Sequence, residues 1–153
     1  MTVEYIRRPM ELTDLDGVLA IAAAQQLAPQ WSRLSYMQAI DPQSFPLRIA
    51  LVAEADGTVA GFSVASVLAM QAELESIAVA PAYQGCGVGR TLLEAMLSAV
   101  AQAGAGEIIL EVRVSNQRAI QLYRKAGFSE AGLRRDYYQG PVEDAFLMRR
   151  TIR

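Results

Sequence analysis

The chain contains no histidine, and Cys86 is its one cysteine among 153 residues. The missing histidine rules out Ser-His-Asp and Cys-His catalysis as well as histidine-bound metals. A single cysteine excludes an internal disulfide and a zinc site built from clustered cysteines. We therefore predict no metal, and any proton transfer must use carboxylates, tyrosine, lysine, cysteine, water or a chain terminus.

Strong charge and long apolar runs are also missing. The 14 basic and 16 acidic side chains give a net charge of −2, whereas nucleic-acid binding needs a strongly basic face. The apolar stretch over residues 18–24 follows acidic residues rather than a basic leader. It is also far shorter than the roughly 18 apolar residues that indicate a membrane span. We expect a cytoplasmic protein that binds neither nucleic acid nor membrane.

Helical and strand-like patterns alternate along the chain without a linker, so that residues 1–153 are expected to form one domain. The turn Asp56-Gly57 predicts a hairpin between two strands. Apolar residues at helical spacing, namely Leu92, Leu93, Met96, Leu97 and Val100, predict an amphipathic helix that ends near Gly104. Further helices are expected behind Thr13 and over 32–40 and 116–126. Strands are expected over 3–8, 49–54, 59–68, 74–79, 108–114, 128–133 and 145–149. This order predicts a mixed α/β (α+β) domain rather than a regular βαβ array.

The most informative segment is a glycine-rich turn, Gln84-Gly-Cys-Gly-Val-Gly-Arg90, between an expected strand and an expected helix. Alternating glycines let the backbone turn tightly and expose successive N–H groups, and the helix start adds unpaired donors. The turn therefore predicts a phosphate site, and a strand-to-helix turn without a ligand is the alternative. A P-loop and a dinucleotide fingerprint are both excluded, because each requires a glycine where Arg90 stands.

Together with Ile77, Val79 and Pro81, this turn resembles the acyl-CoA-binding signature of the GNAT acetyltransferase superfamily. Later motifs resemble the RimI type of that superfamily, the bacterial ribosomal-protein N-alpha-acetyltransferases. They are Leu110-Glu-Val-Arg113, Ser115-Asn116, Ala119, Leu122-Tyr123, Gly127-Phe128, Arg135, Tyr137-Tyr138 and Glu143-Asp144-Ala145. The resemblance implies the GNAT fold, a single mixed and mostly antiparallel sheet flanked by helices, with two splayed parallel central strands.

The resemblance also implies acetyl-CoA as the cofactor. In the family, the pantetheine arm lies beside the strand that here carries Ile77, Ala78 and Val79, and the pyrophosphate binds the following turn. The implied contacts in that turn are Gln84, Gly85, Cys86, Gly87, Val88, Gly89 and Arg90. Asn116 and Tyr123 are implied cofactor contacts as well, although an asparagine at a helix start is equally a cap.

Acetyl transfer to an amine requires a neutral amine, a polarised thioester carbonyl and a proton for the departing thiolate. Glu111 matches the family's catalytic glutamate and is the candidate base; an isolated carboxylate in the middle of a strand is costly unless it is paired or used. The alternative is an ion pair with Arg113 on the same strand face. Tyr123 matches the family's thiol-protonating tyrosine and is the candidate acid, with simple packing as the alternative. Cys86 is not expected to act as a nucleophile, because no histidine activates it.

Five residues are candidates for the acceptor side: Glu73, Glu75, Trp31, Tyr137 and Tyr138. Glu73 and Glu75 share one strand face and are rival candidates for the base, and solvated edge charges are the alternative. Tyr137 and Tyr138 resemble a substrate-side wall, with surface packing as the alternative. Trp31 lies in a segment that resembles the family's Pro-Trp-Ser element with Gln30 inserted.

Three functions remain open at this point. The first is acetylation of a protein N-terminus, ribosomal proteins included, and the second is acetylation of a small amine, amino acid or antibiotic. The third is a non-catalytic acyl-CoA sensor, which would keep residues 84–90 without needing the proton-transfer groups. The presence of both Glu111 and Tyr123 favours an enzyme.

Overall fold

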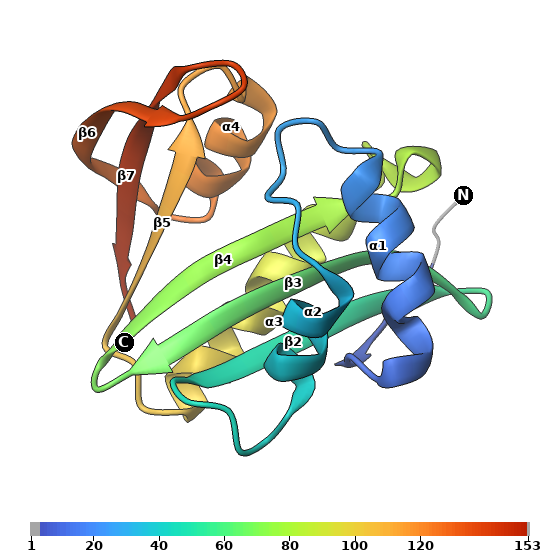
Figure 1. Cartoon of the computed structure of the whole chain (residues 1–153). Helices are drawn as coiled ribbons and strands as arrows, with labels where there is room; N and C mark the ends of the chain where they lie inside the picture. Colours follow the sequence, from blue (N-terminus) through green and yellow to red (C-terminus); the bar gives the residue numbers. More distant parts are fainter. Residues whose placement is uncertain (1–3, 153) are drawn as a thin grey trace.

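In the computed structural model, which describes residues 4–152, seven strands form one sheet in the order β1-β2-β3-β4-β5-β7-β6 (Figure 1). The strands are β1 (Ile6–Pro9), β2 (Leu47–Ala55), β3 (Thr58–Leu68), β4 (Gln71–Val79), β5 (Glu107–Arg113), β6 (Ser129–Tyr138) and β7 (Glu143–Thr151). Within the described residues, neighbouring strands run antiparallel with one exception, the parallel pair β4 and β5. This arrangement confirms the predicted mixed, mostly antiparallel sheet.

Helices cover both faces of the sheet. They are α1 (Leu15–Ala23), α2 (Arg33–Ile40), α3 (Val88–Gln102) and α4 (Gln117–Lys125). In Figure 1, α1 and α2 lie in front of the central strands and α3 lies behind them. No helix among residues 4–152 has the length and apolar character needed to cross a membrane.

The two larger of the three apolar clusters among the described residues fix these layers. The front cluster packs Tyr36 of α2 edge-on against Phe62 of β3, with ring centroids 5.7 Å apart. The rear cluster joins α3 and α4 to the sheet, and it contains most of the apolar stripe predicted for α3. All five residues of that stripe are buried, as expected for a helix that presents one apolar face to a sheet.

The predicted hairpin and the predicted strands are present, with differences at their ends. Asp56 and Gly57 both have positive φ, +52° and +76°, as the tight turn between β2 and β3 requires. The prediction for β6 ended near residue 133, whereas the strand continues to Tyr138; its residues are almost all exposed, so no apolar alternation marked its end. The predicted strand over 3–8 appears as β1, and residue 3 lies outside the described residues.

The end of β4 is packed tightly against β3 and α3 at Gly61. A Cβ atom on Gly61 would lie 2.9 Å from the carbonyl oxygen of Ala78 and 3.0 Å from Cδ1 of Leu92. Gly61 also pairs with Val79, the last residue of β4. The absence of a side chain at Gly61 therefore fixes how closely the end of β4 approaches its neighbours.

We expect Gly61→Ala to lower the free energy of unfolding by about 1–3 kcal/mol, the usual cost of overpacking a core. Gly132→Ala is the matched control, because its Cβ would meet the side chain of Leu147 at an ordinary 3.8 Å. Urea unfolding of both variants measures the difference. Equal stability of Gly61→Ala and the parent protein would contradict the close packing described here.

Candidate active site

The sheet opens between its two parallel strands. Pairing of β4 with β5 covers only Gln71–Glu73 against Glu107–Ile109, and beyond those residues the strands diverge (Figure 1). The opening coincides with a β-bulge, because Leu74 pairs with Ala65 and Ser76 pairs with Val64, which leaves Glu75 as the extra residue of β4. Bulges bend a strand and increase its local twist. The bulge at Glu75 therefore turns the rest of β4 away from β5.

A cavity of about 450 Å³ occupies this opening. Its walls come from β4, β5, α4, the start of α3 and the segment that follows α1. It brings together eleven of the twelve residues predicted to contact the cofactor: Ile77, Ala78, Val79, Gln84, Gly85, Gly87, Val88, Gly89, Arg90, Asn116 and Tyr123. Cys86 is exposed and does not belong to the lining. The volume falls within the range of pockets that hold small molecules and cofactors.

The glycine turn forms an open backbone cradle at one end of the cavity. Gly85 and Gly87 have φ of +77° and +85°, a region that side chains with a Cβ disfavour. Around both positions no atom of the described part of the chain, apart from the adjoining residues, lies within 4 Å of where a Cβ would be. Gly87 is also the N-cap of α3 and supplies no side chain to cover the first N–H groups of that helix. These donors and the positive end of the helix dipole suit a phosphate group.

A chain of side-chain hydrogen bonds links this turn to two other walls. Arg118 of α4 donates to Oε1 of Gln84 at 2.6 Å, and Nε2 of Gln84 lies 3.2 Å from Oε1 of Gln25. Gln25 in turn donates to the carbonyl oxygen of Val79 at 3.0 Å. The sequence prediction missed Gln25 and Arg118, because neither belongs to the glycine motif and only the fold brings them to it.

Glu111 lies at the other end of the cavity with its side chain 16% exposed. The hydroxyl of Tyr137 donates to its Oε1 at 3.3 Å. Nε of Arg134 lies 2.8 Å from Oε2 and forms an ion pair with it, and within residues 4–152 this buried oxygen has no hydrogen-bond donor. The alternative pairing of Glu111 with Arg113 is wrong, because Arg113 pairs with Glu143 at 3.3 Å.

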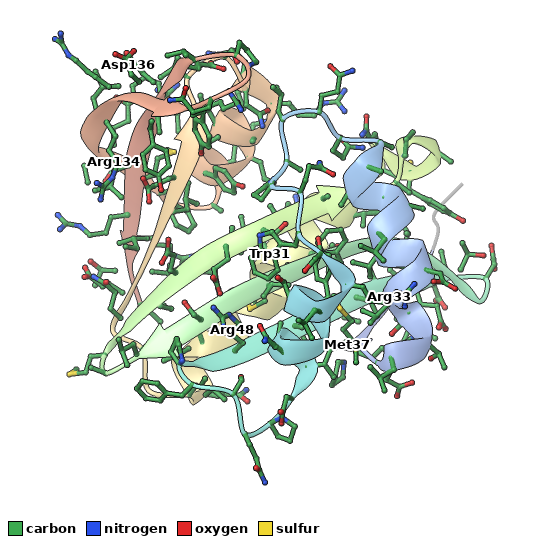
Figure 2. All side chains as sticks on the ribbon, viewed as in Figure 1. Trp31, Arg33, Met37, Arg48, Arg134 and Asp136 are labelled. Carbon is green, nitrogen blue, oxygen red and sulfur yellow. The ribbon has the colours of Figure 1, made fainter. Side chains whose placement is uncertain are left out.

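Strand β4 carries two further carboxylates, Glu73 and Glu75, on the side of the opening across from Glu111 of β5. Glu75 lines the cavity and accepts a hydrogen bond from Nε of Arg48 at 3.0 Å. Figure 2 shows Arg48 in front of the sheet and Arg134 on β6 at its open edge. Glu73 lies outside the lining, and burial raises its pKa, with the charges of Glu75 and Glu111 adding to the effect. Glu73 and Glu75 are therefore not the solvated edge charges that the sequence offered as the alternative. They are partly buried carboxylates.

Tyr123 faces the cavity from α4. It is 6% exposed and packs on Phe128 with ring centroids 5.8 Å apart, so packing and a place in the cavity wall coexist. Burial raises the pKa of its hydroxyl, and nearby Tyr138 raises it further. The hydroxyl therefore carries its proton at neutral pH. At the start of the same helix, Oδ1 of Asn116 accepts the Ala119 N–H at 3.3 Å, so Asn116 is a cap that also lines the cavity.

The predicted aromatic residues of the acceptor side lie in two places. Tyr137 and Tyr138 pack edge to face with centroids 5.1 Å apart, and Tyr138 lines the cavity beneath the Arg113 guanidinium at 4.3 Å. Burial raises the pKa of Tyr138 to about 12. Trp31, labelled in Figure 2, packs on Tyr36 with ring centroids 5.3 Å apart, beside the front cluster. It does not line the cavity.

The chain is similar to known proteins in sequence and in fold. The model of the acetyltransferase (GNAT) family matches residues 18–128. A candidate ribosomal protein bS18-alanine N-acetyltransferase of Bacillus subtilis is 35% identical over 145 residues, 95% of this chain and 94% of that protein. The ribosomal protein bS18-alanine N-acetyltransferase of Escherichia coli is 43% identical over 95 residues, 61% of this chain and 64% of that protein. The crystal structure of the ribosomal-protein-S18-alanine N-acetyltransferase from Escherichia coli has a TM-score of 0.83 and 34% identity, and the match covers 97% of this chain and 94% of that chain.

The raised pKa of Glu73 predicts how its replacement changes stability. A carboxylate whose pKa is raised by folding destabilises the folded state above that pKa, and the cost disappears at lower pH where the group is protonated. Glu73→Gln should therefore raise the Tm at pH 7, with a gain that shrinks toward pH 4. Glu75→Gln, which loses the ion pair with Arg48, should show no such gain. A Tm for Glu73→Gln below that of the parent protein at pH 7 would contradict the unfavourable charge.

Proposed function

The chain belongs to the GNAT acetyltransferase family, and from this premise we propose that it transfers the acetyl group of acetyl-CoA to the N-terminal α-amine of a protein. We also propose that residues 1–153 act as one acetyltransferase domain. The observation that carries the proposal is the placement of Glu111 and Tyr123 on the walls of one cavity that begins at the glycine turn. A proton acceptor, a proton donor and an anion cradle are thus close together.

Members of this family use acetyl-CoA, which supplies an acetyl thioester when bound. The residues present fit this molecule, because the backbone at Gly85 and Gly87 is open and the first N–H groups of α3 are uncapped. We propose that these donors hold the diphosphate and that Arg90 and Arg118 add positive charge beside it. The edge of β4 at Ile77–Val79, which β5 does not pair, offers backbone groups to the pantetheine arm.

Glu111 is proposed as the general base. An acceptor amine arrives as an ammonium ion, and it must lose a proton before its nitrogen can form the new C–N bond. The carboxylate takes that proton directly or through a water molecule. Arg134 and Tyr137 fix the orientation of the carboxylate, and the negative charges of Glu73 and Glu75 draw the ammonium toward it.

Tyr123 is proposed as the general acid. As the C–N bond forms, the C–S bond breaks and the departing thiolate needs a proton. The buried Tyr123 hydroxyl keeps its proton at neutral pH and delivers it to the sulfur. The nitrogen loses a second proton as the amide forms, and this proton restores the Tyr123 phenol by way of solvent. The first proton, which Glu111 took from the ammonium ion, also passes to solvent. A desolvated phenol suits this role, because its hydrogen bond to a developing anion is stronger away from water.

A protein N-terminus is the proposed acceptor, since the relatives that match most of this chain carry names that describe acetylation of a ribosomal protein's alanine. The test is an acetyl-CoA turnover assay with peptides that have free α-amines, the same peptides with blocked α-amines, and small primary amines. We expect turnover of the free peptides and none of the blocked ones. Turnover of small amines alone would show a small-molecule enzyme, and acetyl-CoA binding without any turnover would show a sensor.

We expect Glu111→Gln to lower kcat by about a hundredfold, within the range for loss of a general base. The neutral amide keeps the shape of the side chain but cannot accept the proton. Acetyl-CoA should still raise the Tm of the variant as it does for the parent protein. Glu107→Gln, on the same strand outside the cavity, is the control and should keep the parent rate. A parent rate for Glu111→Gln would end the base assignment.

Tyr123→Phe should lower kcat by about tenfold or more, because the leaving sulfur loses its proton donor while the ring still packs on Phe128. Tyr36→Phe is the matched control, since the Tyr36 hydroxyl is buried on the far side of the sheet from α4 and has no hydrogen-bond partner among residues 4–152. Steady-state kinetics with a saturating acceptor measure both. If Tyr123→Phe turns over as fast as Tyr36→Phe, the phenol contributes only packing.

A further inference from the structure

The pairing of β6 with β7 is interrupted beside Glu111. Arg134 pairs with Ala145 and Tyr138 pairs with Glu143, so that three residues of β6 lie opposite Asp144 alone. In the middle of this bulge, Asp136 has φ of +52°, the left-handed region that residues other than glycine rarely adopt. Such a conformation is unfavourable for a residue with a Cβ and persists where the surroundings hold it.

The bulge changes which side chains share a face of β6. In a regular strand, residues three positions apart point to opposite faces. Arg134 and Tyr137 are three positions apart, yet both contact the Glu111 carboxylate, at 2.8 Å and 3.3 Å. The Arg134 guanidinium also lies 5.7 Å from the centre of the Tyr137 ring. Without the bulge, one of the two contacts with Glu111 would be lost.

A side chain of β7 holds the bulge in place. The N–H of Asp136 donates to Oδ1 of Asp144 at 2.8 Å, in the stretch where the strand pairing is missing. Asp144 is itself fixed, because its carbonyl oxygen accepts the Val114 N–H at the end of β5. Its neighbour Glu143 accepts the Ser115 N–H at 2.6 Å and pairs with Arg113. Hydrogen bonds and an ion pair with residues 113–115 thus fix Asp144 and its neighbour Glu143 at the end of β5.

We propose that Asp144 is a positioning residue, which holds the β6 bulge through the Asp136 N–H so that Arg134 and Tyr137 both reach the Glu111 carboxylate. It acts through these residues and does not touch the reacting atoms. The inference rests on the proposed role of Glu111 and deepens it. The orientation of the Glu111 carboxylate then depends on the hydrogen bond from the Asp136 N–H to Asp144, which lies outside the cavity.

The test compares Asp144→Ala, which removes the acceptor, with Asp144→Asn, whose amide oxygen still accepts an N–H. Asp144→Ala should lower kcat by about ten- to a hundredfold, since a small misplacement of reacting groups has effects of that size. The KM for acetyl-CoA should stay within about twofold, because Asp144 does not line the cavity. Asp144→Asn should recover most of the lost kcat. If Asp144→Ala does not fold, Asp144→Val replaces it, because valine also lacks an acceptor and favours strands.

A double-mutant cycle with Tyr137→Phe separates positioning from general stability. If Asp144 acts by aiming Tyr137 and Arg134, Asp144→Ala should cost less kcat in the Tyr137→Phe protein than in the parent. Equal costs in both backgrounds would overturn the proposal. So would a parent kcat for Asp144→Ala, or an Asp144→Asn variant as slow as Asp144→Ala.

A spectroscopic titration of Tyr137 tests the positioning without any turnover. Burial raises the pKa of Tyr137, and the charge of Glu111 and the hydrogen bond to it raise it further. In Asp144→Ala this pKa should move down toward the ordinary value for tyrosine, and in Asp144→Asn it should stay raised. An unchanged pKa in Asp144→Ala would overturn the positioning role. The titration of Tyr137 does not depend on catalysis, so it tests the positioning role of Asp144 alone. The kinetics of Glu111→Gln separately test whether Glu111 is the base.

Discussion

Backbone pairing between β4 and β5 stops after Glu73 and Ile109, and the site depends on this loss of hydrogen bonds. The backbone groups that face the opening must bond to something other than a neighbouring strand, because unpaired polar groups are costly to bury. The carbonyl of Val79 already takes a donor from the Gln25 side chain. Both strands stay in place because β3 still pairs with β4 and β7 still pairs with β5.

The cavity between these strands has ends of opposite character. At one end the glycine turn, the start of α3, Arg90 and Arg118 present donors and positive charge. At the other end Glu111 and Glu75 present carboxylates, with Glu73 behind them. In the proposed reaction, the anionic cofactor and the cationic acceptor are therefore attracted to different ends of one cavity. Holding both reactants in one place contributes to catalysis by removing the entropy of their encounter.

Features set by neighbouring residues were predictable from the sequence. The Asp56-Gly57 turn, the apolar stripe of α3 and the glycine turn each depend on a few consecutive positions. The resemblance carried by residues 73–149 then gave the fold with its splayed strands, which no periodicity indicates. Most of the residues expected to contact the cofactor were identified from the glycine turn or from the resemblance to the family. The fold brings them together around one cavity.

Contacts between distant segments were not predictable in the same way. The sequence offered Arg113, two residues away, as the alternative ion-pair partner of Glu111. The hairpin of β6 and β7 instead brings Arg134 to Glu111 and Glu143 to Arg113. Gln25 reaches Val79 across 54 positions of the chain. The bulge at Asp136 contains no glycine or proline, so no local sequence signal predicts it. Its positive φ is held instead by the side chain of Asp144 on the next strand.

The opened pair of strands is tested most directly by an NMR titration of the labelled protein with acetyl-CoA. We expect the largest backbone amide shifts at residues 76–79, 84–90 and 116–119, and little change in the turn between β3 and β4 at the far end of the sheet. Shifts concentrated at that far turn, or amides of residues 76–79 that do not respond at saturating acetyl-CoA, would contradict a cofactor held along the open edge of β4.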